Sequence, residues 1–168
     1  GETSTLNCAK LLTNMASLHK RAERYEQAIA LWERASTIYE RIEGKASAGY
    51  LNCMTEISSA YNRTGNLEQA TNVNERLQHT LQQSNTNDER WAISLLNQAQ
   101  SYTNEGNYAQ AIVLQQQALS TFVVRNDSLK MCHALKGLSN TYHLQGNTQI
   151  AIDTCLKAPC GCLVANGN

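Results

Sequence analysis

Tyr61-Asn-Arg-Thr-Gly65-Asn66 is a six-residue stretch that occurs three times in this chain of 168 residues. The other copies are Tyr102-Thr-Asn-Glu-Gly106-Asn107 and Tyr142-His-Leu-Gln-Gly146-Asn147. An Ala stands nine residues after each Tyr, and a degenerate copy with His19 in the Tyr position comes before them. The intervals are 42, 41 and 40 residues between the successive alanines Ala28, Ala70, Ala111 and Ala151. This regular spacing indicates four copies of one structural unit.

Each copy has the chemistry of a tight turn between two helices. Gly65 can adopt the left-handed conformation that ends a helix, and Asn66 is a good N-cap for the next helix. Between units, Asn85-Thr-Asn-Asp88 and Asn126-Asp-Ser128 supply further turns, with Asp or Ser as the cap. The single proline, Pro159, leaves the preceding residues free to be helical.

Apolar residues between the turns recur at intervals of three and four, as on the buried face of a helix. In the first unit this set begins with Leu11, Met15 and Leu18, and in the last unit it ends with Ile150, Ala151 and Cys155. A small residue stands three positions before each His or Tyr, where it lets paired helices approach closely. These small residues are Ala16, Ser58, Ala99 and Ser139.

Taken together, the small residue, the aromatic, the Gly and the Ala resemble the tetratricopeptide repeat. The resemblance covers roughly residues 6–158, and the unit length is similar to the long units of kinesin light chains. It implies an all-α fold, a right-handed α-solenoid of four antiparallel helix pairs, the last one short. We expect units at about 6–44, 47–85, 88–126 and 128–158 within a helical domain of residues 1–158. A Cys- and Gly-containing tail follows at 159–168. Glu23 departs from the family pattern, since it replaces the turn Gly.

The resemblance also implies that the first helix of each pair lines a concave groove that binds a peptide segment of another protein. In this family Asn residues placed like Asn14 and Asn97 hold the backbone amides of the ligand. An amide suits this task because it both donates and accepts. The alternative is that these side chains are simply solvated helix faces. The lining residues expected from the resemblance are Asn14, Ser17, Lys20, Arg21, Ser59, Asn62, Asn97, Gln100, Lys136, Asn140 and His143.

Charge and hydropathy limit the classes of partner. The chain has 14 Lys and Arg against 14 Asp and Glu, so its net charge is zero and it lacks the field that attracts nucleic acid. No stretch reaches the roughly 18 apolar residues of a membrane span, and no signal peptide is visible. We therefore expect no nucleic-acid or membrane partner, and a cytoplasmic location is favoured.

Catalytic and metal motifs are absent from the sequence. No Gly-rich phosphate loop, HExxH or CxxC occurs, so we expect no enzyme activity and no cofactor. The six cysteines are interpreted mainly as small buried residues. A zinc site formed by His143, Cys155, Cys160 and Cys162 is the alternative, but its spacing fits no standard finger, and no metal is predicted. The sequons at Asn62 and Asn126 are as frequent as chance predicts.

The ends of the repeat array carry a second hypothesis. Solenoids need polar terminal caps, and no amphipathic capping helix follows residue 158. Either the chain is a piece of a longer protein, or another chain covers the end. Only 17% of residues are charged, against about 25% in typical domains, so a surface rich in Asn, Gln, Ser and Thr tolerates self-packing. The sequence thus predicts an adaptor that binds a peptide, with end-to-end self-assembly into an oligomer or filament as the alternative.

Overall fold

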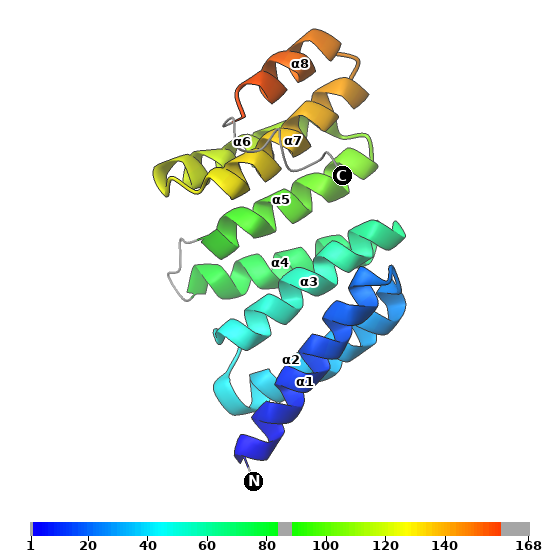
Figure 1. The fold of residues 1–168 in the computed structure, drawn as a ribbon, viewed down its shortest axis with the longest axis vertical. Coiled ribbons are helices and arrows are strands. Elements are labelled where there is room, and N and C mark those ends of the chain that lie inside the picture. Colours follow the sequence, from blue (N-terminus) through cyan, green and yellow to red (C-terminus); the bar gives the residue numbers. More distant parts are fainter. Residues whose placement is uncertain (1, 84–88, 159–168) are drawn as a thin grey trace. The chain divides into compact units, whose positions relative to one another are not determined.

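The computed structural model describes residues 2–83 and 89–158, with side chains from Thr5 onward. All regular structure in these ranges is helical, which confirms the all-α prediction (Figure 1). The expected turn at 85–88 and the tail at 159–168 lie outside the described residues. The helices of the described ranges are α1 (Glu2–Arg21), α2 (Tyr25–Glu43), α3 (Ala48–Thr64), α4 (Leu67–Gln83), α5 (Glu89–Asn104), α6 (Tyr108–Val124), α7 (Ser128–Leu144) and α8 (Thr148–Leu156).

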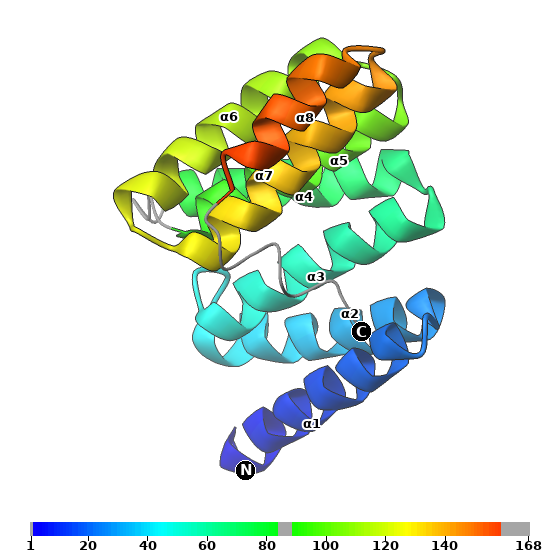
Figure 2. The ribbon, with the colours of Figure 1, turned by 45° about the horizontal axis from the view of Figure 1, so that its top comes forward.

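The chain divides into two compact parts, residues 1–87 and residues 88–168, here called the N-terminal half and the C-terminal half. In the N-terminal half α1 packs on α2, α2 on α3, and α3 on α4. In the C-terminal half the same order holds for α5 to α8, and Figure 2 shows α6, α7 and α8 side by side. Each half is therefore a stack of two consecutive helix pairs, as the four-unit prediction requires.

The turns inside the pairs follow the repeated stretch. Gly65, Gly106 and Gly146 all have a positive φ, between 75° and 91°. Glu23, which stands in the Gly position of the first unit, also has a left-handed φ of 58°. This conformation is strained for a residue with a Cβ. The side chain of Asn107 caps α6 by accepting a hydrogen bond from the Gln110 N–H at 3.4 Å. The glycines thus act as predicted, with strain at the degenerate copy. The predicted Asn cap forms at Asn107, whereas the Asn147 side chain makes no cap and donates to the Gln145 side chain at 2.9 Å.

The turn between the last two units is capped by Asp127, as predicted. Its carboxylate accepts the backbone N–H of Lys130 at 3.1 Å and pairs with the Lys130 ammonium at 2.6 Å. The same ammonium lies 3.1 Å from a carboxylate oxygen of Glu89, at the start of α5. The hydrogen bonds from Lys130 lower the pKa of Asp127 below its usual value. This half-buried ion cluster joins the beginnings of α5 and α7.

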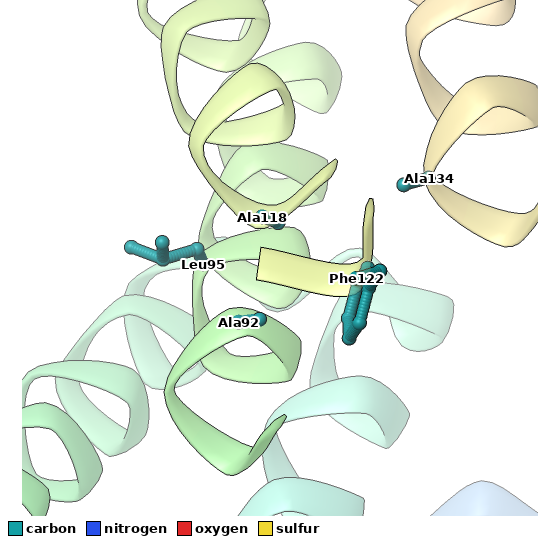
Figure 3. Close-up of a cluster of buried hydrophobic side chains, with 5 residues drawn as sticks. All are labelled: Ala92, Leu95, Ala118, Phe122 and Ala134. Carbon is teal, nitrogen blue, oxygen red and sulfur yellow. The ribbon is translucent and has the colours of Figure 1, made fainter. Parts of the chain in front are cut away.

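Small residues shape the interior, as their positions predicted. Ala16, Ser58 and Ala99 are completely buried. In the C-terminal half, alanines from three helices surround one aromatic ring, and Figure 3 shows the Phe122 ring beside Ala134. This cluster consists of Ala92, Leu95, Ala118, Phe122 and Ala134. Because alanines allow close helix approach, α5, α6 and α7 can all pack against the Phe122 ring.

The two end helices differ from the sequence expectation. Leu11, Met15 and Leu18 are exposed, and the buried residues of α1 are instead Ala9, Leu12 and Ala16. At the other end, Ile150 and Cys155 are exposed while Ala151 is buried. The periodicity located apolar residues on one side of each helix. The prediction that they are buried was wrong, because no described helix covers that side. Among the described residues no helix is long and apolar enough to cross a membrane.

Candidate functional site: the first-helix faces

The expected lining residues fall at equivalent positions of the repeats. Offsets of 42, 41 and 40 residues place Ser17, Ser59, Gln100 and Asn140 at one position on the first helices of the four units. We call these four residues the central stripe. Ser17, Gln100 and Asn140 are exposed, and Ser59 is half-buried. Each half therefore presents two accessible, uncharged side chains of the central stripe, on α1 and α3 or on α5 and α7.

Hydrogen bonding leaves part of the central stripe open. The Ser17 hydroxyl donates to the Thr13 carbonyl at 3.0 Å, and the Gln100 amide donates to the Asn104 side-chain oxygen at 2.8 Å. Both retain acceptor capacity, because a hydroxyl or amide oxygen has two lone pairs. Within the described part of the chain, the side chains of Ser59 and Asn140 have no hydrogen-bond partner. These groups can therefore both donate to and accept from a ligand.

A second set of predicted lining residues lies where neighbouring first helices meet. The Lys20 ammonium of α1 pairs with the Glu56 carboxylate of α3 at 2.6 Å. At the equivalent position of α5, Thr103 is buried, and its hydroxyl lies 3.2 Å from the Thr141 hydroxyl of α7. Asn62, also at this position, is buried. Only His143, in the last unit, is exposed. This position therefore mainly joins one repeat to the next.

The ion pair changes the charge expected on the N-terminal half. Glu56 stands at the position equivalent to Asn14 and offsets the charge of Lys20. Sequence reasoning missed Glu56, although aligning the repeats places it in the second unit at the position that Asn14 holds in the first. Arg21 and Lys136 remain exposed, as does Asn14, while Asn97 is half-buried and engaged. The first-helix faces are thus mostly neutral.

The cysteines offer little chemistry in the described residues. Cys53 is buried, and this burial raises the pKa of its thiol to about 11. Cys8 and Cys155 are exposed, contrary to the expectation of small buried residues, and the Cys155 thiol donates to the Ser139 hydroxyl at 3.0 Å. Cys132 is half-buried and disulfide-bonded. The described residues contain no group of three potential metal ligands, and Cys160 and Cys162 lie outside them.

The model of the tetratricopeptide repeat family matches residues 7–77 and 91–158. This chain belongs to the tetratricopeptide repeat (TPR) family. The match covers both halves and confirms the resemblance inferred from the repeated stretch. No curated protein matches the TPR chain.

Solved structures share the fold of this TPR chain at low identity. BtubC (BKLC) from P. vanneervenii is 17% identical with a TM-score of 0.74, over 95% of this chain and 66% of that one. A putative kinesin light chain with nearly identical TPR-like repeats from Podosopora anserina is 18% identical, with a TM-score of 0.71, over 86% of this chain and 70% of that one. This neighbour supports the long-unit variety predicted from the spacing.

A third neighbour is a Rap protein complexed with competence and sporulation factor. It is 17% identical with a TM-score of 0.80, over 91% of this chain and 43% of that one. The TPR chain therefore spans 66% of BtubC and less than half of the Rap protein. At these identities the neighbours show the fold alone.

Proposed function

We propose that this TPR chain is a non-catalytic adaptor that binds an extended segment of a partner protein on its first-helix faces. TPR domains generally mediate protein–protein interactions, and the family match covers repeats alone. The observation that carries the proposal is the central stripe. Ser17, Ser59, Gln100 and Asn140 are accessible and uncharged, and all retain hydrogen-bonding capacity.

The chemistry of the central stripe suits a peptide backbone. An extended peptide has unpaired N–H and C=O groups on both of its edges, and side-chain amides and hydroxyls can pair with both kinds. Because the stripe is uncharged, we expect binding that depends weakly on salt. Exposed Arg21 and Lys136 add a local preference for acidic side chains near one end of each face. The Rap complex named above supports ligand binding by a chain of this fold.

A peptide-display library screened against the whole chain tests the proposal. We expect selected peptides to lose about 3- to 10-fold in affinity when Asn140 is changed to Ala, since this removes one hydrogen-bonding group. Asn72→Ala is the matched control, because Asn72 is an exposed amide on the second helix α4. Failure to select any peptide, or equal losses for both variants, would count against the first-helix faces as the site.

Self-assembly by end-to-end stacking is the second candidate function. The observation that favours it is the exposure of large apolar residues on α1 and α8. It uses the end helices rather than the central stripe, so the two functions can be tested separately.

A further inference from the structure

Helix α1 presents an apolar face that no described helix covers. Leu11, Met15 and Leu18 are spaced by four and three residues, so they lie on one side of the helix. Their exposed fractions range from 41% to 63%. Large apolar side chains that are exposed side by side mark an interaction surface, whereas single exposed apolar residues need no explanation.

The internal repeats show what packs on this face elsewhere in the molecule. The positions equivalent to Leu11, Met15 and Leu18 are only 0–3% exposed in α3 and α7. There, the preceding second helix covers them: α2 packs on α3, and α6 packs on α7. The face of α1 is therefore the receiving side of a repeat junction. The equivalent residues are Cys53, Ile57 and Ala60 in α3, and Ala134, Leu138 and Thr141 in α7.

Helix α8 presents the opposite side of the same junction. Ile152 is 49% exposed, whereas its equivalent in α2, Ile29, is 6% exposed. Leu156, also exposed, stands at the position of Glu33 in α2 and Gln116 in α6. Glu33 accepts a hydrogen bond from the Tyr61 hydroxyl of the following first helix at 3.4 Å, and Gln116 donates to the equivalent tyrosine hydroxyl at 3.5 Å. Leu156 thus occupies a position that contacts the next unit.

We propose that α8 of one copy packs on α1 of a second copy and joins the copies head to tail through one more repeat junction. The register follows from the α6–α7 contact, in which Gln115 meets Thr141 at 3.0 Å. Transferred to the ends, Cys155 meets Leu18, and Leu156 meets His19. Because α8 ends at Leu156, the contact covers the C-terminal part of α1, from Met15 onward.

A second copy fits these ends better than an unrelated partner, because one chain carries both sides of the junction. Each side lacks its neighbour among the described residues, and the groups brought together are mainly apolar on both sides. The net charge of zero gives no repulsion between copies. Such a contact is heterologous, so each added copy leaves one α1 face and one α8 face open for growth.

Sedimentation velocity over a hundredfold concentration range, with reductant present, tests the proposal. We expect the mass of the wild-type chain to rise with concentration to species above the dimer. Leu18→Asp blocks the α1 face, and Leu156→Asp blocks the α8 face, so each variant alone stays a monomer. An equimolar mixture forms a species of twice the monomer mass and nothing larger, because only one open face of each kind remains.

Val124→Asp is the control, since Val124 is exposed on α6 and belongs to neither end face. This variant assembles as the wild type does, and circular dichroism verifies that all variants are folded. A wild-type chain that stays monomeric throughout would overturn the proposal. Self-association of Leu156→Asp alone would also overturn it, because that result indicates an isologous contact between α1 faces. Peptide binding on the central stripe is unaffected by Leu156→Asp on the second helix α8, which distinguishes this proposal from the adaptor function.

Discussion

Three equivalent positions lie at the junction between repeats in both halves, and the two halves fill them with different side chains. In the N-terminal half these residues are Lys20, Trp32 and Ala60, and in the C-terminal half they are Thr103, Gln115 and Thr141. Trp32 and Ala60 are completely buried, while Lys20 pairs with Glu56. The N-terminal junction thus combines an apolar interior with a surface charge pair.

The C-terminal junction is a buried polar network. The Thr141 hydroxyl accepts a hydrogen bond from the Gln115 amide, lies 3.2 Å from the Thr103 hydroxyl, and donates to the Gly137 carbonyl at 3.0 Å. Gly137 also lies close to the Gln115 side chain, since a Cβ there would stand 3.3 Å from the amide nitrogen. The comparison teaches that side chains must fill the space at this junction, but that they can be either apolar, as Trp32 and Ala60 are, or polar, as Gln115 and Thr141 are. The amide nitrogen of Gln115 is paired there with Thr141, although the side-chain oxygen of Gln115 is buried without a hydrogen-bond partner among the described residues.

The largest effect is expected from Trp32→Gln, which gives the N-terminal junction the residue that Gln115 provides in the C-terminal junction. The change removes a fully buried ring and buries an amide opposite Ala60, which has no hydroxyl. We expect the free energy of unfolding to fall by about 3–5 kcal/mol. Urea unfolding followed by circular dichroism measures it, with exposed Arg34→Gln on the same helix expected to change it by less than about 0.5 kcal/mol. A loss below about 1 kcal/mol for Trp32→Gln would show that the junction tolerates either chemistry.

Thr141→Val gives the next largest effect, because it leaves the buried Gln115 amide without its acceptor. The Thr103 hydroxyl keeps its hydrogen bond to the Ala99 carbonyl at 2.9 Å. The expected loss is about 1–3 kcal/mol of unfolding free energy. Adding Gln115→Met to this variant removes the unpaired amide and should restore at least half of the loss. Additive losses in the double variant would mean that the two side chains are not coupled.

The turn inside the first unit gives a smaller effect of opposite sign. Glu23 holds a left-handed φ that Gly106 and Gly146 hold without a Cβ. We expect Glu23→Gly to raise stability by about 1 kcal/mol, since relief of this strain outweighs the entropy that Gly adds to the unfolded chain. The melting temperature should rise by about 2–4 °C. The reverse change, Gly106→Glu, should lower it, and equal signs for the two variants would contradict this account.

The smallest effect is expected at the ion pair of the N-terminal junction. The side chains of Lys20 and Glu56 are each 38% exposed, so solvent screens their attraction. Lys20→Met should change the free energy of unfolding by no more than about 1 kcal/mol, and added salt should reduce the difference between the two proteins. A larger, salt-independent loss would show that the pair behaves as a buried one.

Local chemistry explains which features could be predicted from the sequence. The turns depend on residues adjacent in the chain, such as Gly65 and Asn66, and so the helix pairs were predictable. The exposure of Leu18 was not, because periodicity reveals an apolar face but not whether a helix covers it. The central stripe follows from repeat spacing, whereas the burial of Thr103 depends on contact with Thr141 in another unit.

The buried thiol of Cys53 gives access to the kinetics of the N-terminal half. Its sulfur lies 3.9 Å from the Thr13 hydroxyl of α1 and belongs to the face of α3 on which α2 packs, so solvent reaches it mainly when these two helices separate from α3. With a pKa of about 11, only about one thiol in a thousand is ionised at pH 8. Alkylation of Cys53, resolved from that of exposed Cys8 and Cys155 by mass spectrometry, is therefore limited by how often the first helix pair opens from α3. Any partner seated across α1 should slow this reaction, which makes the thiol a reporter of occupancy at that end of the repeat array.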